Sequence, residues 1–317
     1  MLFLVFYIYI IQTKQGFVKS CAKKSKKMTF LRKYIVDERK FLCYTGVTNP
    51  KNREGFLMRL GRIQNNYTTE GFDLVKSTGL DFIEICCNSA EDADRLIAAR
   101  ESVRAEIART GVDVSCVGRW CHSLQEGGKI NGEKKKNYLA LLDTAVALGA
   151  RTFVCGCNYD DSISLYRNYE NAIGFFSELI ERADGRLRVA VQNCDWNNFI
   201  VSPKHWEVVL GELPALSLKF DASHAYNRGE DYLTQLSDWG ERVAHVHVKG
   251  TTHAGKRNVA DPPAGMDDIR WRSLFSVLYA RGYTGDLSIE PHSDVWMGEL
   301  GAAGVAFTRD FIRQFIL

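Results

Sequence analysis

Short runs of apolar and β-branched residues alternate with longer amphipathic windows along most of this chain. Eight runs are typical of strands, and they cover residues 41–47, 81–87, 113–119, 151–157, 187–193, 216–222, 242–248 and 286–292. Windows between them, such as 90–110 and 134–150, carry apolar residues at helical spacing. Eight strand–helix units in succession favour a closed parallel barrel over an open sheet, and no GxGxxG follows the first strand. We therefore predict an α/β fold with a single (β/α)8 TIM barrel.

The length and composition agree with one such barrel that acts on a small molecule. The 317 residues suffice for a barrel of about 250 residues with extensions. The net charge is only +3 and no long Lys/Arg block follows residue 40, so no nucleic-acid partner is expected. The nine cysteines are an odd number and lie mostly in apolar runs, which indicates free thiols and a cytoplasmic location.

Residues 1–40 are expected to form an N-terminal extension, and the barrel is predicted over residues 41–317. Residues 1–11 are apolar, but this run is too short to span about 30 Å of hydrocarbon comfortably. It lacks a preceding basic segment and a clean cleavage site, so it is only weakly signal-like. Because Met28 is an alternative start, residues 1–27 stay open between upstream sequence, a signal and a weak anchor. No membrane partner is expected for the barrel itself.

Four predicted strands in the second half each end on a residue that can hold a metal ion. These residues are Gln192, Asp221, His247 and Glu290. In a (β/α)8 barrel alternate strand residues face inward, and the chemistry gathers at the C-terminal ends of the strands. We therefore expect the four side chains to lie level and to converge. A lone inward Asp or His is often only a satisfied polar group, but four convergent side chains indicate a site.

The same alternation assigns neighbouring side chains to the inward face. Lys219 is expected to share that face with Asp221, and Val243 and His245 are expected to share it with His247. His245 lies deeper than His247 and is expected to support it or fill the core rather than bind a metal.

A hard divalent cation suits this set of side chains. Such an ion prefers oxygen ligands, tolerates imidazole and keeps positions open for substrate oxygens. We predict one divalent metal ion, Mn²⁺ first, with Mg²⁺, Co²⁺ and Zn²⁺ as alternatives. The expected ligands are Asp221, His247, Glu290 and the side-chain oxygen of Gln192.

Three motifs around these strand ends resemble the xylose isomerase-like superfamily of sugar isomerases and epimerases, over about residues 41–315. They are F-D-x-S-H at 220–224, H-V-H-x-K at 245–249 and G-Y-T-G-D-L-S-I-E-P-H at 282–292. The resemblance implies a metal held by a Glu, an Asp, a His and a second Glu, and a sugar or polyol substrate. Asp221, His247 and Glu290 match three of these ligands, and His224 resembles a residue that contacts substrate. It also implies that a homo-oligomer is common among such proteins.

Gln192 stands where the resemblance implies a Glu that also exchanges a proton with the substrate. An amide cannot act as a base at accessible pH, so a two-base epimerase mechanism is in doubt. One-base reactions stay open: aldose–ketose isomerisation, dehydration and β-elimination. Glu290 is the expected base, and replacement of the missing carboxylate by Asp195 or Glu84 is the weaker alternative. The candidate acid partners are His224, Lys249 and His292.

Further side chains are candidates for contacting substrate. Trp120 follows the third predicted strand and Trp196 the fifth, where an indole ring can form an apolar wall for a sugar. Arg119 and His292 complete the predicted substrate-binding set. Structural alternatives stand beside these roles, because either tryptophan can cap the barrel rim and Lys249 can be a surface lysine.

Three classes of function remain open. The first is a metal-dependent sugar or polyol isomerase or epimerase-like enzyme, or a related lyase or dehydratase acting on a keto-sugar or inosose. The second is a non-catalytic sugar-binding barrel in which Gln192 marks a decayed site. The third, an abasic-site endonuclease, is disfavoured because it needs a D-x-H after the seventh strand. This chain has Asp261, Pro262 and Pro263 there instead.

Overall fold

The structure is a computed structural model that describes residues 58–120, 123–291 and 293–317. Several predictions fall outside these residues: the N-terminal extension at 1–40, its signal-like part at 1–27, the strand at 41–47 and the role of His292. Within the described ranges, no helix is both long enough and apolar enough to cross a membrane.

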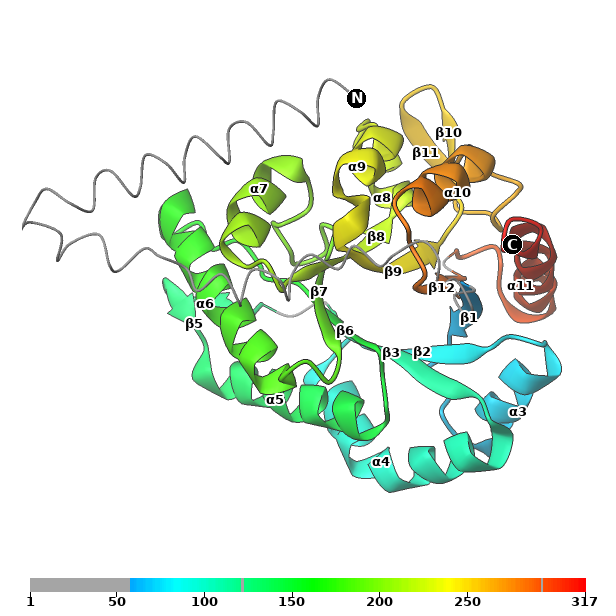
Figure 1. The fold of residues 1–317 in the computed structure, drawn as a ribbon, viewed down its shortest axis with the longest axis horizontal. Coiled ribbons are helices and arrows are strands. Elements are labelled where there is room, and N and C mark those ends of the chain that lie inside the picture. Colours follow the sequence, from blue (N-terminus) through cyan, green and yellow to red (C-terminus); the bar gives the residue numbers. More distant parts are fainter. Residues whose placement is uncertain (1–57, 121–122, 292) are drawn as a thin grey trace, which may run out of the picture. The chain divides into compact units, whose positions relative to one another are not determined.

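Eight parallel strands close into a barrel, which confirms the predicted (β/α)8 fold (Figure 1). Strands that follow one another along the barrel are hydrogen-bonded neighbours, and the last pairs with the first. The barrel strands are β1 Arg59–Ile63, β2 Phe82–Cys87, β3 Asp113–Arg119, β6 Thr152–Cys155, β7 Arg188–Gln192, β8 Ser217–Asp221, β9 Val243–Val248 and β12 Asp286–Ile289.

The first barrel strand that the structure describes is Arg59–Ile63, a segment that is not among the eight predicted runs. Its sequence, RLGRI, contains two arginines and a glycine, and its apolar signal is therefore weak. The glycine is required by close packing, because a Cβ on Gly61 would come within 2.4 Å of the Phe82 backbone oxygen. Because this strand needs a glycine for close packing against β2, its sequence lacks the continuous apolar run that would have predicted it.

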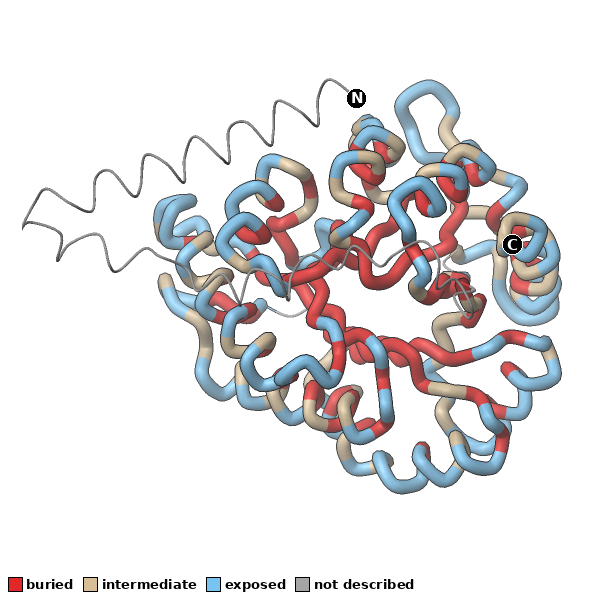
Figure 2. The backbone as a smooth tube through the Cα atoms, viewed as in Figure 1, coloured by how far each residue is buried: buried red, intermediate tan, exposed pale blue. Residues whose placement is uncertain are grey.

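Helices surround the barrel, and their outward faces are exposed while the strands are buried (Figure 2). Local signals set their ends: α4 begins at a capping box formed by Ser89 and Asp92 and is closed by Gly111 in the left-handed conformation, with φ of 75°. The helices are α3 Thr69–Ser77, α4 Ala90–Thr110, α5 Gly132–Ala147, α6 Leu165–Ala183, α7 Pro203–Glu212, α8 Ala222–Asn227, α9 Tyr232–Trp239, α10 Trp271–Ala280, α11 Gly298–Arg313 and the 3₁₀ helix η2 Gly240–Arg242.

Two short hairpins interrupt the βα loops. The strands β4 Gln125–Glu126 and β5 Lys129–Ile130 pair after β3, and β10 Thr252–Ala254 and β11 Arg257–Ala260 pair after β9. Loops of this kind follow the C-terminal ends of barrel strands, the face at which such barrels carry their chemistry.

The strand β9 contains a bulge that resets which side chains face the barrel interior. Leu218 pairs with Val243 but Lys219 pairs with His245, so Ala244 is the extra residue. Val243 packs in the outer apolar layer and Ala244 in the inner one. The prediction that Val243 shares the inner face is therefore wrong, whereas His245 does face the interior.

Candidate metal centre

A cavity of about 840 Å³ opens at the C-terminal ends of the barrel strands. This volume is in the range of small-molecule sites, about 300–1,000 Å³. Residues at or just beyond the ends of β1, β2, β3, β7, β8, β9 and β12 contribute to its walls. The predicted site residues that line it are Trp120, Trp196, His224, His247, Lys249 and Glu290.

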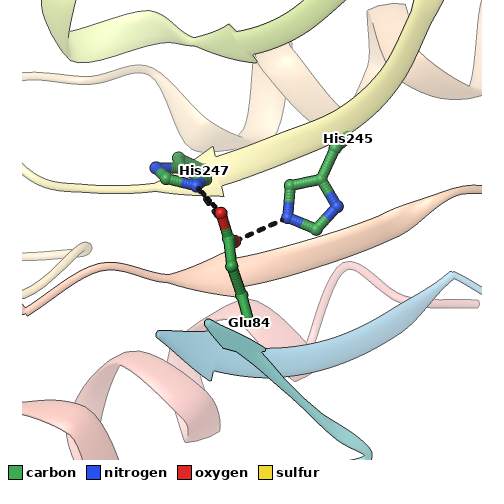
Figure 3. Close-up of side chains that lie close together, drawn as sticks. All are labelled: Glu84, His245 and His247. Atoms are coloured by element: carbon green, nitrogen blue, oxygen red, sulfur yellow. Dashed lines mark hydrogen bonds and ion pairs between the residues drawn. The ribbon is translucent and has the colours of Figure 1, made fainter. Parts of the chain in front are cut away.

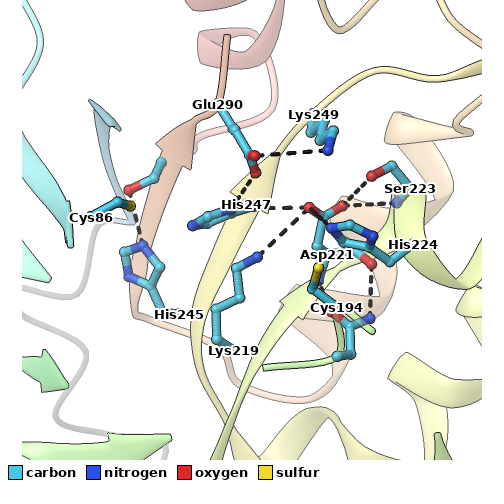
Figure 4. A network of polar contacts seen from close by, with 12 residues as sticks. Cys86, Cys194, Lys219, Asp221, Ser223, His224, His245, His247, Lys249 and Glu290 are labelled. Carbon is cyan, nitrogen blue, oxygen red and sulfur yellow. Dashed lines mark hydrogen bonds and ion pairs between the residues drawn. The ribbon is translucent and has the colours of Figure 1, made fainter. Parts of the chain in front are cut away.

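Three of the four predicted ligands lie together, and two of them, His247 and Glu290, line this cavity. The ligand atoms of Asp221, His247 and Glu290 are within 4.8 Å of one another. His247 Nδ1 is 2.6 Å from Glu290 Oε2 and 4.0 Å from Asp221 Oδ2 (Figure 4). Strand register produces this arrangement, because Asp221 pairs with His247 across β8 and β9, and His247 pairs with Ser288 two residues before Glu290.

Asp221 is held so that one carboxylate oxygen turns toward the cluster. Its Oδ1 accepts hydrogen bonds from the Ser223 backbone N–H at 2.9 Å and from Ser223 Oγ at 2.7 Å. Asn193 bonds the Asp221 main chain in both directions, at 2.8 and 2.9 Å. The other oxygen, Oδ2, is buried and accepts no hydrogen bond from any described residue. Nitrogen atoms of His224 and Lys219 lie 3.5 and 3.7 Å from it.

His247 is supported from the side of its ring opposite Glu290. Its Nε2 lies 3.0 Å from both carboxylate oxygens of Glu84, a fully buried residue of β2 across the barrel (Figure 3). Glu84 also bonds His245 Nε2 at 2.8 Å, and His245 bonds Ser288 Oγ at 2.9 Å. A carboxylate behind a histidine fixes its ring and tautomer, and it leaves the other nitrogen to bind a metal. Nδ1 of His247 is the nitrogen that faces the cluster.

The electrostatic environment favours the charged forms of Glu84 and His247. Burial alone would raise the pKa of Glu84, but His247 and His245 hold the pKa well below its ordinary value. Burial alone would lower the pKa of His247, yet Glu84 and then Glu290 raise it. Glu84 is therefore a carboxylate that accepts from the His247 Nε2–H.

The cavity side of the cluster combines a carboxylate, an ammonium group and a neutral imidazole. Burial would raise the pKa of Glu290, but Lys249 and His247 hold it well below its ordinary value. Lys249 Nζ lies 3.7 Å from Glu290 Oε1, and Glu290 and Asp221 raise the pKa of Lys249 against the effect of burial. Burial lowers the pKa of His224 to about 4, so this imidazole is neutral near pH 7.

Gln192 ends β7 and is almost completely buried, with 1% of its surface exposed. Its Nε2 lies 3.5 Å from the Trp196 carbonyl oxygen, while its Oε1 has no hydrogen-bond partner in the described part of the chain. It pairs in register with Lys219, the residue two before Asp221. Asn198 holds the following loop by donating to the Gln192 carbonyl oxygen at 2.8 Å.

These donor atoms fit a hard divalent cation. Two buried oxygens, Asp221 Oδ2 and Gln192 Oε1, lack a donor among the residues described, and a buried acceptor without a partner is costly. The imidazole of His247 and the carboxylate of Glu290 lie beside Asp221. Mn²⁺ accepts oxygen ligands together with one imidazole, and Mg²⁺ shares the preference for oxygen ligands.

The predicted substrate-binding residues separate into two groups. Trp120 is buried and forms an inner wall of the cavity, whereas Trp196 is 55% exposed at its edge. Arg119 does not line the cavity, because its guanidinium donates to the Cys87 and Trp120 carbonyl oxygens and lies 5.5 Å from the Tyr138 ring. The Arg119 side chain leaves β3 on the helix side and contacts Asn137 and Tyr138 of α5.

Two residues that matter here have weak signals in the sequence. Glu84 lies behind His247 and shares a hydrogen bond with it, and its only signal is a lone acid inside the buried strand FIEICC. Lys219 lines the cavity and is 1% exposed. Its inward direction follows from strand alternation, but its importance does not.

Solved structures with this fold include sugar epimerases and a dehydratase. The 3-keto-D-glucoside 4-epimerase from E. coli has a TM-score of 0.65 at 17% identity, covering 81% of this chain and 99% of that one. D-psicose 3-epimerase from Clostridium cellulolyticum H10 has a TM-score of 0.65 at 16% identity, with the same coverages of 81% and 99%. The probable 3-DHS dehydratase from Bacillus anthracis has a TM-score of 0.61 at 14% identity, covering 77% and 93%. At these identities the likeness shows a shared fold.

Comparison with curated protein sequences finds no match. The family described as "Xylose isomerase-like TIM barrel" matches residues 72–314, which is more than half of the chain. This span includes seven of the barrel strands and the cluster from Glu84 to Glu290. The chain therefore belongs to the xylose isomerase-like TIM barrel family, in agreement with the motifs at its strand ends.

Proposed function

We propose that this protein is a metal-dependent enzyme that moves a proton next to the carbonyl group of a sugar or polyol. The observation that carries the proposal is the convergence of Asp221, His247 and Glu290 at a cavity of sugar size. The names of similar structures, 3-keto-D-glucoside 4-epimerase and D-psicose 3-epimerase, support this substrate class.

The expected metal ligands are Asp221, His247 Nδ1, Glu290 and the side-chain oxygen of Gln192. When bound there, one divalent ion would polarise the substrate carbonyl and make the neighbouring C–H more acidic. We propose Mn²⁺ first, with Mg²⁺, Co²⁺ and Zn²⁺ as alternatives, because three of the four donors are oxygen atoms.

Glu290 is the proposed base, because its lowered pKa keeps it ionised and it lines the cavity. It takes the proton from the carbon beside the carbonyl, and the C–H electron pair moves toward the carbonyl oxygen. Lys249, 3.7 Å from Glu290 Oε1, is the proposed acid, and the neutral His224 holds a substrate hydroxyl. Lys249 protonates the carbonyl oxygen and takes back the proton of the hydroxyl on the deprotonated carbon, and return of the proton from Glu290 to the former carbonyl carbon completes an isomerisation.

A lyase or dehydratase is the second candidate, and Gln192 is the observation that favours it. Epimerisation requires a proton donor and a base on opposite faces of one carbon, and an amide supplies neither. In an elimination Glu290 removes one proton and Lys249 protonates the departing hydroxyl oxygen. The reaction needs one base only.

Solvent deuterium exchange tests the proposal. The purified chain, loaded with Mn²⁺ or treated with chelator, is incubated in D₂O with ketoses, keto-glycosides and inososes, and substrate C–H signals are followed by NMR. We expect metal-dependent loss of one C–H signal, or formation of an eliminated product, which Glu290→Gln abolishes. A folded, metal-loaded protein that leaves the whole panel unchanged would contradict the proposal and favour a non-catalytic sugar-binding barrel.

We also propose a cytoplasmic location and a partner set limited to small molecules and further copies of this chain. The location is supported by buried, unpaired thiols in the described strands and loops, which suit a reducing compartment. Gel filtration coupled to light scattering measures the oligomeric state.

A further inference from the structure

Two lysines project into the cavity beside the proposed metal ligands. Lys219 is 1% exposed and Lys249 is 6% exposed, yet both line the cavity. Their nearest carboxylate oxygens are far for hydrogen bonds. Lys219 Nζ lies 3.7 Å from Asp221 Oδ2, and Lys249 Nζ lies 3.7 Å from Glu290 Oε1 (Figure 4). Hydrogen bonds of ammonium groups are shorter, about 2.7–2.9 Å. Neither ammonium group donates such a bond to a described side chain or carbonyl, so their N–H groups remain available to a ligand.

Lys219 is held in place by packing rather than by a hydrogen-bonded partner. Its Nζ lies 5.2 Å from the centre of the Trp120 ring, and the ring lines the same cavity. The residue opposite Lys219 on β7 is Gln192. A neutral amide cannot balance the ammonium charge, whereas a carboxylate at that position would. The positive charge of Lys219 therefore faces the cavity and is not balanced by a charge at the paired position on β7.

Charge balance in the buried cluster points in the same direction. Glu84, Asp221 and Glu290 carry three negative charges, and Lys219 and Lys249 carry two positive charges, which leaves one negative charge in excess. A bound divalent cation would turn this into one formal positive charge in excess. The aspartates at 195 and 261 lie nearer to solvent, where their influence is screened. Buried excess charge is unfavourable unless a ligand neutralises it.

We propose that the substrate is a sugar acid, and that Lys219 and Lys249 bind its carboxylate beside the metal. This inference rests on the proposed metal-dependent function and names its substrate class. No arginine lines the cavity in the described part of the chain, so the fork that usually recognises a phosphate is missing. Two lysines that converge on a compact planar anion suit a carboxylate.

Matched acid and alditol pairs test the inference by calorimetry. D-Gluconate and D-glucitol, D-galactonate and galactitol, and D-mannonate and D-mannitol each differ only by a carboxylate in place of a CH₂OH group. We expect at least one acid to bind about tenfold or more tightly than its alditol, and Mn²⁺ to strengthen acid binding. D-glucitol 6-phosphate provides the phosphate arm. Equal binding of acid and alditol, tighter binding of the phosphate, or no binding of any acid overturns the inference.

Variants assign the effect to the lysines. Lys219→Met and Lys249→Met each keep an unbranched apolar side chain one atom shorter and remove the charge, and each should lower acid affinity about tenfold while alditol affinity is unchanged. Lys136→Met is the matched control, because Lys136 is 71% exposed on α5. Circular dichroism checks folding, and Lys249→Met carries the test if Lys219→Met does not fold. An unchanged acid affinity in the folded variants contradicts the inference.

The two proposals fail in different ways. Acid selectivity without Mn²⁺ binding or proton exchange would sustain the lysine subsite and refute the metal-dependent function. Metal-dependent exchange that occurs only with neutral ketoses would sustain the function and refute the acidic substrate.

Discussion

In the proposed chemistry, Gln192 limits what the site can do with a proton. It places an oxygen atom at the end of β7, buried and without a partner in the described residues, and it carries no charge. An amide keeps an oxygen atom that can bind a metal ion, but it cannot act as a base. Lys219 pairs with Gln192 in register. This corner of the site is therefore more positive than it would be with a Glu at position 192.

Gln192→Glu tests this account of the corner. The added carboxylate should raise Mn²⁺ affinity about tenfold, which corresponds to about 1.4 kcal/mol, with part of the gain offset by pairing with Lys219. Calorimetric titration measures it, and Gln314→Glu at the exposed C-cap of α11 controls for the added charge. Epimerase activity should also increase in this variant. If affinity rises without any gain in epimerisation, the cavity rather than residue 192 selects the reaction.

Glu84 is expected to act on the metal only through His247. Glu84→Gln removes the charge behind Nε2 and allows the imidazole to turn or change tautomer, so Mn²⁺ affinity should fall about 10- to 100-fold. Glu133→Gln at an 83% exposed position of α5 is the matched control. Circular dichroism should show the barrel intact. An unchanged Mn²⁺ affinity in folded Glu84→Gln would mean that the residue only fills the core.

Site residues were predictable where a strand end coincides with a family motif. Asp221, His247 and Glu290 satisfy both conditions, and the structure brings them together. Glu84 satisfies neither, because its partner is 163 residues away and the contact exists only once the barrel is closed. Of the neighbours Arg119 and Trp120, both expected to contact substrate, Trp120 is the one that lines the cavity.

Barrel strands were predictable from apolar runs except where the chain departs from a regular strand. Seven predicted runs contain barrel strands, but β1 was missed because RLGRI is not an apolar run. The bulge at Ala244 in β9 also left no clear signal, and it changed the face assigned to Val243. Both departures depend on pairing with a neighbour, which periodicity within one strand does not report.

Asp286 links β12, β1 and β3 near their N-terminal ends, at the end of the barrel opposite the cavity. It is 2% exposed and accepts hydrogen bonds from Arg59 Nε at 2.9 Å, Arg59 Nη2 at 2.8 Å and the Ser115 hydroxyl. Burial alone would raise the pKa of Asp286, but Arg59 and Ser115 lower it. The folded state therefore binds this proton less readily than the unfolded chain does.

Asp286→Asn should destabilise the barrel by about 1.5–3 kcal/mol at pH 7, because it removes the buried carboxylate that Arg59 pairs with and leaves Arg59 only its exposed partner Asp113. A lowered folded pKa stabilises the protein above the unfolded value of about 4, and this contribution is lost as the pH falls through the folded pKa. Urea unfolding from pH 7 to pH 3 should therefore show the two proteins converging at low pH. Asp73→Asn, in an exposed ion pair, should cost less than about 1 kcal/mol. A difference between Asp286→Asn and wild type that is independent of pH would contradict the assigned ion pair.

The closed barrel gathers residues that are far apart in sequence into one buried cluster. Glu84, Asp221, His247 and Glu290 come from β2, β8, β9 and the loop after β12, and none of them forms the site alone. The barrel also buries their charges, so each carboxylate and ammonium group depends on its neighbours for a partner. One metal ion at this cluster is the claim on which the proposed chemistry rests.

Calorimetric titration of the chelator-treated protein with Mn²⁺ tests that claim most directly. The account predicts one ion per chain, lost in Asp221→Ala and in His247→Ala. Asp195→Ala should keep it, because Asp195 belongs to a separate group of donor atoms with Cys194 and His224. Failure to bind Mn²⁺, Mg²⁺, Co²⁺ or Zn²⁺ at millimolar concentration, or binding that survives in folded Asp221→Ala, would contradict it.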